Sequence, residues 1–170
     1  MAIDTEDNDK LVGAHLATTL DLQDTQNVTN WRSTPASEPY IELLKHIFKN
    51  MDRSKIPPGK IAFGKALFTD LEYTGVAIPL IMTHYRRFYD EGYNVHMGFV
   101  SNVKIHKLFD SMPAFAGTNH SQVLGFKDHR KFEWNGKTPF AGETEVPVLA
   151  LYTTDLSSIF TDAKQRIPKL

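Results

Sequence analysis

The 170 residues suffice for one globular domain, and 41% of them are hydrophobic, enough for a sizeable core. Lysine and arginine number 19 against 20 aspartates and glutamates, so the basic surplus typical of nucleic-acid or membrane binding is absent, and we expect neither partner. The chain has no cysteine, which excludes disulfides, thiol nucleophiles and thiolate metal sites. The longest apolar run, Val76–Met82, is too short to span a bilayer and the acidic start does not resemble a signal peptide, so we expect a cytoplasmic protein.

The first half of the chain contains two strand patterns separated by a helix pattern. Leu11–Leu22 partly alternates apolar and polar residues and predicts a strand, which the polar, proline-containing segment 23–39 follows as a loop. Spacings of three and four predict an amphipathic helix with an apolar face of Tyr40, Ile41, Leu44, Ile47, Phe48 and Met51. Lys60–Phe68 predicts a second strand, and Gly64 in its middle predicts a bulge or a close backbone approach.

The second half continues the alternation and ends with two strands. A helix is expected over Val76–Glu91, a strand over Val95–Val100 and a helix over Asn102–Met112. The Val76–Glu91 helix should bury Ile78, Ile81, Tyr85 and Phe88. Strands over Ser121–Trp134, interrupted at Gly125, and Val146–Thr154 form a closing hairpin. This order predicts an α/β fold with a mixed central sheet and flanking helices.

Most catalytic motifs are absent from this sequence. It contains no G-x-S-x-G elbow, no H-E-x-x-H pair, no Walker loop and no G-x-G-x-x-G turn. Its seven histidines show neither an i, i+4 pair nor a compact cluster, so we predict no metal site.

The junction between Phe68 and the Val76–Glu91 helix carries the clearest chemical signal. A strand-to-helix turn built on Gly75, with the small Ala77 beside it, lets backbone N–H groups face an anion at the start of the helix. The alternative is that Gly75 only permits a tight turn.

The order of these features resembles the GNAT family of N-acetyltransferases, and its spacing is most similar to the animal arylalkylamine N-acetyltransferase branch. The family's pyrophosphate loop, in the variant Tyr-Arg-Gly-x-Gly-Ile-Ala, would here read Tyr73-Thr-Gly-Val-Ala-Ile-Pro79. Asn102 stands where the family's next strand often ends, and Gly125-Phe126 matches a Gly-Phe pair after its next helix. The resemblance covers about Lys10 to Tyr152 and implies the acyl-CoA N-acyltransferase fold.

The resemblance implies transfer of an acetyl group from acetyl-CoA, as co-substrate, to the amine of a small molecule such as an arylalkylamine. It implies a V-shaped slot between Ile61–Phe68 and Val95–Val100. The acetyl-CoA-binding residues that it implies are Ala66, Leu67, Phe68, Thr74, Gly75, Val76, Ala77, Ile78 and Asn102. His96, on the neighbouring strand, is a candidate general base with a near-neutral reference pKa, and the alternative is a packed or surface histidine.

Several positions depart from the family pattern. Thr74 replaces the arginine of the loop, Ala77 its second glycine and Pro79 its closing alanine, and proline has no N–H to donate. Phe109 stands where many members place a tyrosine as general acid, and it cannot donate a proton. These departures leave a second interpretation open: a catalytically inactive GNAT-like module that binds acyl-CoA or another protein.

Leu11–Leu22 resembles a strand that lies well inside the family's domain, so we expect an N-terminally shortened domain. The expected divisions are a polar tail (1–10), the GNAT-like domain (11–160) and a C-terminal tail (161–170). We expect the sheet order to follow the chain. The outer edge of the first strand would then face water and be completed by an identical copy or by a separate chain, because exposed edges promote association.

Overall fold

The computed structural model describes the backbone of residues 1–22, 34–70, 72–73, 75–101, 121–123, 125, 128–143 and 149–166. Within these ranges, the side chains of 121–123 and 162–166 lie outside the description. The helix expected over Asn102–Met112 lies outside the described residues.

The described chain forms one mixed sheet with helices on both faces, as the sequence predicted. The strands are β1 (Ala2–Asp4), β2 (Lys10–Leu20), β3 (Ile61–Thr69), β4 (Val95–Val100), β5 (Ser121–Val123) and β6 (Ala150–Asp155). The helices are α2 (Glu38–Lys49), α3 (Ala77–Asp90) and α5 (Leu156–Arg166), with 3-10 turns η1 (Arg53–Lys55) and η2 (His129–Lys131). No described helix has the length and apolar character needed to cross a membrane.

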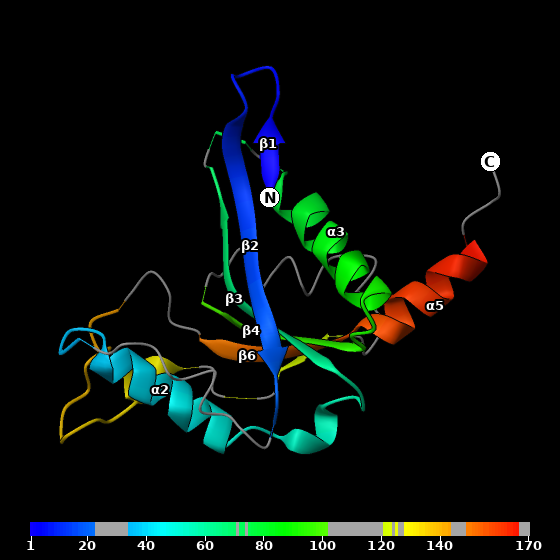
Figure 1. Ribbon diagram of the computed structural model, residues 1–170. Helices are drawn as coiled ribbons and strands as arrows, with labels where there is room; N and C mark the ends of the chain where they lie inside the picture. The colour runs from blue at the N-terminus through cyan, green and yellow to red at the C-terminus, as the bar shows by residue number, and fades with distance from the viewer. Residues whose placement is uncertain are drawn as a thin grey trace.

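The helices divide between the two faces of the sheet (Figure 1). On one face α2 packs through Leu43, Leu44 and Ile47 against a core that includes Phe63 of β3 and Met97 of β4. On the other face α3 and α5 meet β4 and β6 around a second core of Ile81, Tyr85, Val100, Ala150, Tyr152, Leu156, Ile159 and Phe160. Residues of β4 therefore pack into both cores, which explains why this strand is apolar along most of its length.

The strand order corrects one expectation. The order is β1-β2-β3-β4-β6-β5, so β6 lies between β4 and β5 instead of following the chain to the edge. Among the described strands, β3 and β4 alone pair in parallel, and the other neighbours are antiparallel. The last strand of the chain is central, with β4 on one side and β5 on the other.

Three local expectations also need correction. The long strand over Ser121–Trp134 is reduced among the described residues to β5, and η2 occupies part of the remainder. The expected C-terminal tail overlaps α5, which begins at Leu156 and buries Ile159 and Phe160. Ile78, expected inside α3's core face, is 37% exposed.

The N-terminal segment pairs with the sheet, although it was expected to be a polar tail. Ala2 lies opposite Gly13, Ile3 opposite Leu11 and Asp4 opposite Lys10. The expectation of a bare outer edge is therefore wrong for the first residues of β2. Completion of the remaining edge by a second chain stays a prediction.

Candidate functional site

The two parallel strands separate halfway along their length. They pair from Ile61 opposite Val95 to Gly64 opposite Gly98, and β3 then continues to Thr69 without β4 as a neighbour. On its other side β3 is bulged, because Ala17 lies opposite Gly64 and Leu16 opposite Ala66. The bulge bends β3 away from β4 at the glycine where the sequence predicted an irregularity.

A cavity of about 470 Å³ fills the gap between the separated strands. Its walls include Ala66, Leu67 and Phe68 of β3 and Gly98, Phe99 and Val100 of β4. Tyr40 and Leu44 of α2 line it from one layer, and Ile81 and Tyr85 of α3 line it from the other. The cavity is therefore a slot through the sheet, open to residues of both layers, with strand backbone along its sides.

The slot reaches the start of α3, where Ala77 forms part of its wall. The first helical hydrogen bond runs from Leu80 N to Val76 O, so the N–H groups of Val76, Ala77 and Ile78 precede it and Pro79 has none. No acidic side chain occupies the first turn. Among the described residues no acceptor is bonded to these three amides, so they and the positive end of the helix dipole can face an anion.

Gly75 gives the chain the turn that leads into this helix. Its φ is +90°, a value that L side chains rarely adopt, and beyond its chain neighbours no atom of the described residues lies within 4 Å of the place where a Cβ would stand. The glycine is therefore required by backbone conformation and not by lack of space.

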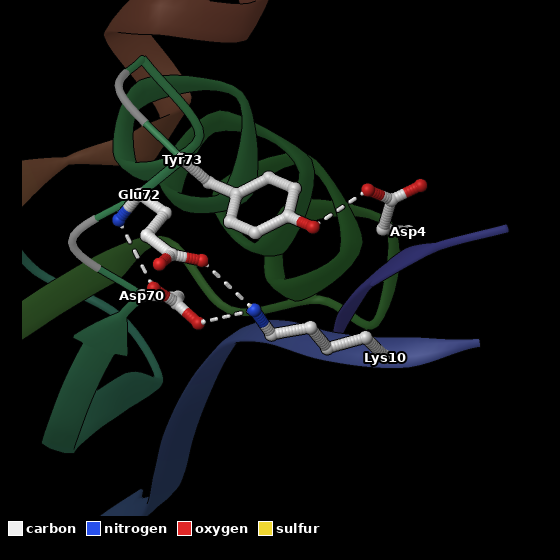
Figure 2. Close-up of polar contacts among 5 residues, drawn as sticks. All are labelled: Asp4, Lys10, Asp70, Glu72 and Tyr73. Carbon is white, nitrogen blue, oxygen red and sulfur yellow. Dashed lines mark hydrogen bonds and ion pairs between the residues drawn. The ribbon is translucent and has the colours of Figure 1, made fainter. Parts of the chain in front are cut away.

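The N-terminal hairpin fastens the segment before α3 (Figure 2). Lys10 Nζ lies 3.2 Å from both Asp70 Oδ2 and Glu72 Oε2. Tyr73 Oη donates a hydrogen bond to Asp4 Oδ2 at 2.7 Å, which raises the pKa of Tyr73 to about 12. Lys10 thereby offsets two negative charges in the segment that precedes α3.

Removing either contact should loosen this segment without unfolding the domain. In Lys10→Met and Tyr73→Phe we expect faster amide hydrogen exchange at Glu72 and Tyr73, whose N–H groups donate to Asp70. The control is Lys60→Met, since Lys60 stacks on Tyr93 near the start of β3. Equal exchange in the native protein and the two hairpin variants would contradict this role.

The structure also gathers three histidines that the sequence gave no reason to group. His15 of β2, His84 of α3 and His96 of β4 lie in ring contact, with centroids 4.9 Å apart for His15–His84 and 5.5 Å for His15–His96. His15 and His96 line the slot. Burial lowers the pKa of His15 to about 4 and lowers the pKa of His96 well below its usual value.

Tyr85 is a further slot residue that the sequence assigned only to the core. Its side chain is 1% exposed, its ring lies 4.6 Å from that of His96, and burial raises the pKa of its phenol. The hydroxyl therefore stays protonated at neutral pH and is able to donate a hydrogen bond.

Comparison with known proteins shows the same architecture in solved structures of low sequence identity. Arylalkylamine N-acetyltransferase 2 from Aedes aegypti matches with a TM-score of 0.71 at 16% identity, over 92% of this chain and 72% of that one. The polyamine N-acetyltransferase of Drosophila melanogaster, which forms N-acetylagmatine, gives 0.61 at 16% identity, over 86% and 69%. The chain has the GNAT fold.

One of the matching structures is not named as an acetyltransferase. The C-terminal condensation domain of Ebony, solved with beta-alanyl-dopamine, matches with a TM-score of 0.59 at 12% identity, over 88% of this chain and 68% of that one. No family model matches the sequence, and no curated protein matches it either.

Most residues that the GNAT resemblance implied lie along one path in the structure. Ala66, Leu67, Phe68 and Ala77 line the slot, and Gly75, Val76 and Ile78 lie at the turn and first residues of α3. His96 lies in the slot wall, 7% exposed. Thr74, Asn102 and Phe109 lie outside the described residues.

Proposed function

We propose that the chain is an acyl-CoA-dependent N-acyltransferase that transfers an acetyl group to the amine of a small molecule. The supporting observation is the slot between β3 and β4, which joins unpaired strand backbone to the free N-terminus of α3. Such an arrangement suits a long molecule that carries a phosphate at one end and hydrogen-bonding amides along its length. Acetyl-CoA has this form.

The proposed contacts follow from placing the pyrophosphate at the start of α3 and the acyl group in the slot. The amides of Val76, Ala77 and Ile78 bind the pyrophosphate, in the turn set by Gly75. The unpaired backbone of Ala66–Phe68 binds the pantetheine arm and the acyl carbonyl. We assign Thr74 and Asn102 to the same site from the sequence resemblance alone.

The thioester then lies near the point where the strands separate, which brings the reaction close to His96. The amine attacks the thioester carbonyl, and the site must orient the amine, accept its proton and stabilise the oxyanion. His96 is the proposed base, because its imidazole lines the slot and is uncharged at neutral pH.

Calorimetric titration of the native chain with acetyl-CoA tests the binding half of this proposal. We expect binding at sub-millimolar concentration. Thiol release across an amine panel that includes agmatine and 2-phenylethylamine tests the chemistry. Binding without thiol release would select the catalytically inactive acyl-CoA-binding module, and an absence of binding would reject both and leave a protein-interaction role.

A matched pair of variants localises the binding. Gly75→Ala forces a side chain into a positive φ and should weaken acetyl-CoA binding by about tenfold, since about 1.4 kcal/mol of strain falls on the anion-binding turn. Gly136→Ala carries the same kind of strain, at φ +68° with open space around its Cβ, but in a turn between Trp134 and Lys137. An equal effect of the two variants on affinity would place the binding elsewhere.

A further inference from the structure

The β1–β2 hairpin meets the chain both before and after the turn that leads from β3 into α3. Directly after β3, Asp70 N donates a hydrogen bond to Val12 O of β2 at 2.8 Å. Beyond the turn, β2 packs closely on α3 itself, because a Cβ on Gly13 would stand 3.2 Å from Leu80 Cδ2. The backbone of the hairpin thus brackets the turn at Gly75.

Two side-chain contacts join the hairpin to the middle of the same segment (Figure 2). Lys10 Nζ, at the start of β2, lies 3.2 Å from both Asp70 Oδ2 and Glu72 Oε2. Asp4 of β1 accepts the hydrogen bond of Tyr73 Oη at 2.7 Å. Lys10 Nζ also lies 5.1 Å from the centroid of the Tyr73 ring, so the two contacts form one cluster.

The segment supplies few polar contacts of its own. Glu72 N donates to Asp70 Oδ1 at 3.0 Å, and Tyr73 N donates to Asp70 O at 3.1 Å, which closes a local turn on Asp70. At Gly75, beyond its chain neighbours, no atom of the described residues lies within 4 Å of a Cβ position. Among the described polar contacts, those of the hairpin are the ones that reach residues 70–75 from elsewhere in the fold.

The charges of this cluster affect the binding of an anion at the start of α3. Asp70 and Glu72 stand shortly before the amides of Val76–Ile78, so their negative charges oppose a pyrophosphate there. Both carboxylates point at Lys10 Nζ in Figure 2. Hydrogen bonds to Glu72 and Asp70 raise the pKa of Lys10, which therefore stays positive and weakens this repulsion.

Resting on the proposed function, we propose that the β1–β2 hairpin positions the pyrophosphate-binding turn of the acyl-CoA site, with Lys10 and Tyr73 as its positioning residues. Neither residue needs to touch the ligand. Lys10 holds Asp70 and Glu72 away from the incoming anion, and the Tyr73–Asp4 hydrogen bond ties the turn to the edge of the sheet. The turn is then ordered before the ligand arrives, so binding loses less conformational entropy.

This arrangement couples the ligand and the hairpin in both directions. If the docked hairpin strengthens binding, the bound ligand must stabilise the docked hairpin by the same factor. We expect saturating acetyl-CoA to slow amide hydrogen exchange at Glu6 and Lys10, whose N–H groups donate to Asp4 and Asp7 within the hairpin. Neither amide belongs to the proposed ligand contacts, so their protection reports the coupling.

Calorimetric titration with acetyl-CoA tests the two positioning residues separately. We expect the Kd to rise by about tenfold in Lys10→Met and about fivefold in Tyr73→Phe, in the usual range of coupling between sites. Lys10→Arg keeps the charge and the contacts to two carboxylates, so its Kd should stay close to the native value. Salt at about 0.5 M should shrink the difference between Lys10→Met and the native chain, because it screens the freed carboxylates.

Steady-state thiol release separates positioning from general damage. In both variants the KM for acetyl-CoA should rise while kcat at saturation stays native, because the thioester reacts in the slot and not at the turn. The matched controls remove the same groups elsewhere. Lys45→Met breaks an exposed ion pair with Glu42, and Tyr93→Phe removes a hydroxyl hydrogen-bonded to Thr19 Oγ1 at 2.7 Å. Both controls should bind acetyl-CoA as the native chain does.

Native Kd values in both Lys10→Met and Tyr73→Phe would overturn the positioning role, and so would hairpin exchange that acetyl-CoA leaves unchanged. Equal losses of affinity in the controls would overturn it as well. If Tyr73→Phe fails to fold, Lys10→Met decides, since the Lys10 side chain is 36% exposed. A native chain that does not bind acetyl-CoA overturns the proposed function and this role together, whereas a native chain that binds it no better than the two variants overturns this role alone.

Discussion

The free energy of unfolding should fall steeply as the pH is lowered from about 6.5 to about 4, because the folded protein holds buried histidines uncharged. The pKa of His15 falls from 6.5 to about 4 on folding, with burial as the main cause, and the pKa values of His84, His96 and His129 are lowered in the same direction. Between these pH values the unfolded chain binds protons that the folded chain does not, so stability rises with pH. His15 alone accounts for about 3 kcal/mol across this window.

Urea unfolding at a series of pH values measures this effect. His15→Gln should flatten the dependence of the unfolding free energy on pH. Carboxylates such as Asp128, whose hydrogen bond from Arg130 lowers its pKa to about 2, contribute only at lower pH. If the unfolding free energy depended on pH equally in the native protein and in His15→Gln, His15 would not be the source of this effect.

The second large effect is expected from a single methyl group at the apex of the slot. In Gly64→Ala the new Cβ would stand 2.8 Å from His96 Nε2, closer than real Cβ atoms approach their neighbours, and 3.0 Å from His15 Nε2, which is tight. Tyr85 and Phe88 contact the ring of His96, so the imidazole has little room to move aside. We expect a loss of about 1–3 kcal/mol in the free energy of unfolding.

Gly98→Ala is the matched control for this variant. Gly98 lies opposite Gly64 in the parallel pair, yet a Cβ there would meet its nearest atom, His96 Cε1, at 3.4 Å, an ordinary contact. Chemical denaturation of both variants should show a clear loss only in Gly64→Ala. Equal stabilities would mean that the histidine rings do not rest on Gly64.

The elements with strong periodicity could be predicted from the sequence. The spacing of apolar residues in α2 and α3 and the run Val95–Val100 gave these elements within a residue or two, and Gly64 marked the bulge in β3. These signals are local, because each arises from the residues that make the element itself.

The elements that the sequence did not predict depend mostly on contacts between distant segments. β1 is only three residues long and ends in the acidic Asp4, so it forms only because β2 offers it an edge. The position of β6 between β4 and β5 follows from tertiary pairing, which no pattern within the strand encodes. For α5 a signal was present, since Leu156, Ile159 and Phe160 have helical spacing, but the segment was short and close to the end.

The candidate site likewise has a part that local sequence signals indicate and a part that depends on contacts between distant segments. The turn at Gly75 and the strand Ala66–Phe68 are contiguous in the sequence, so the resemblance could point to them. The histidine cluster joins residues from three elements, of which His15 and His96 are 81 positions apart, and neither spacing nor composition indicates their contact. Such a cluster becomes visible only when the register of β2, β3 and β4 is known.

The separation of β3 from β4 gives this protein an internal sheet edge. Beyond Gly64 and Gly98 the two strands turn backbone hydrogen-bonding groups toward each other across a gap, as the outermost strands of a sheet do toward solvent. Here the flanking layers enclose these groups, so another protein strand cannot easily add to them, but a narrow extended molecule can. Whatever fills the gap completes the sheet, and its binding energy then becomes part of the stability of the fold.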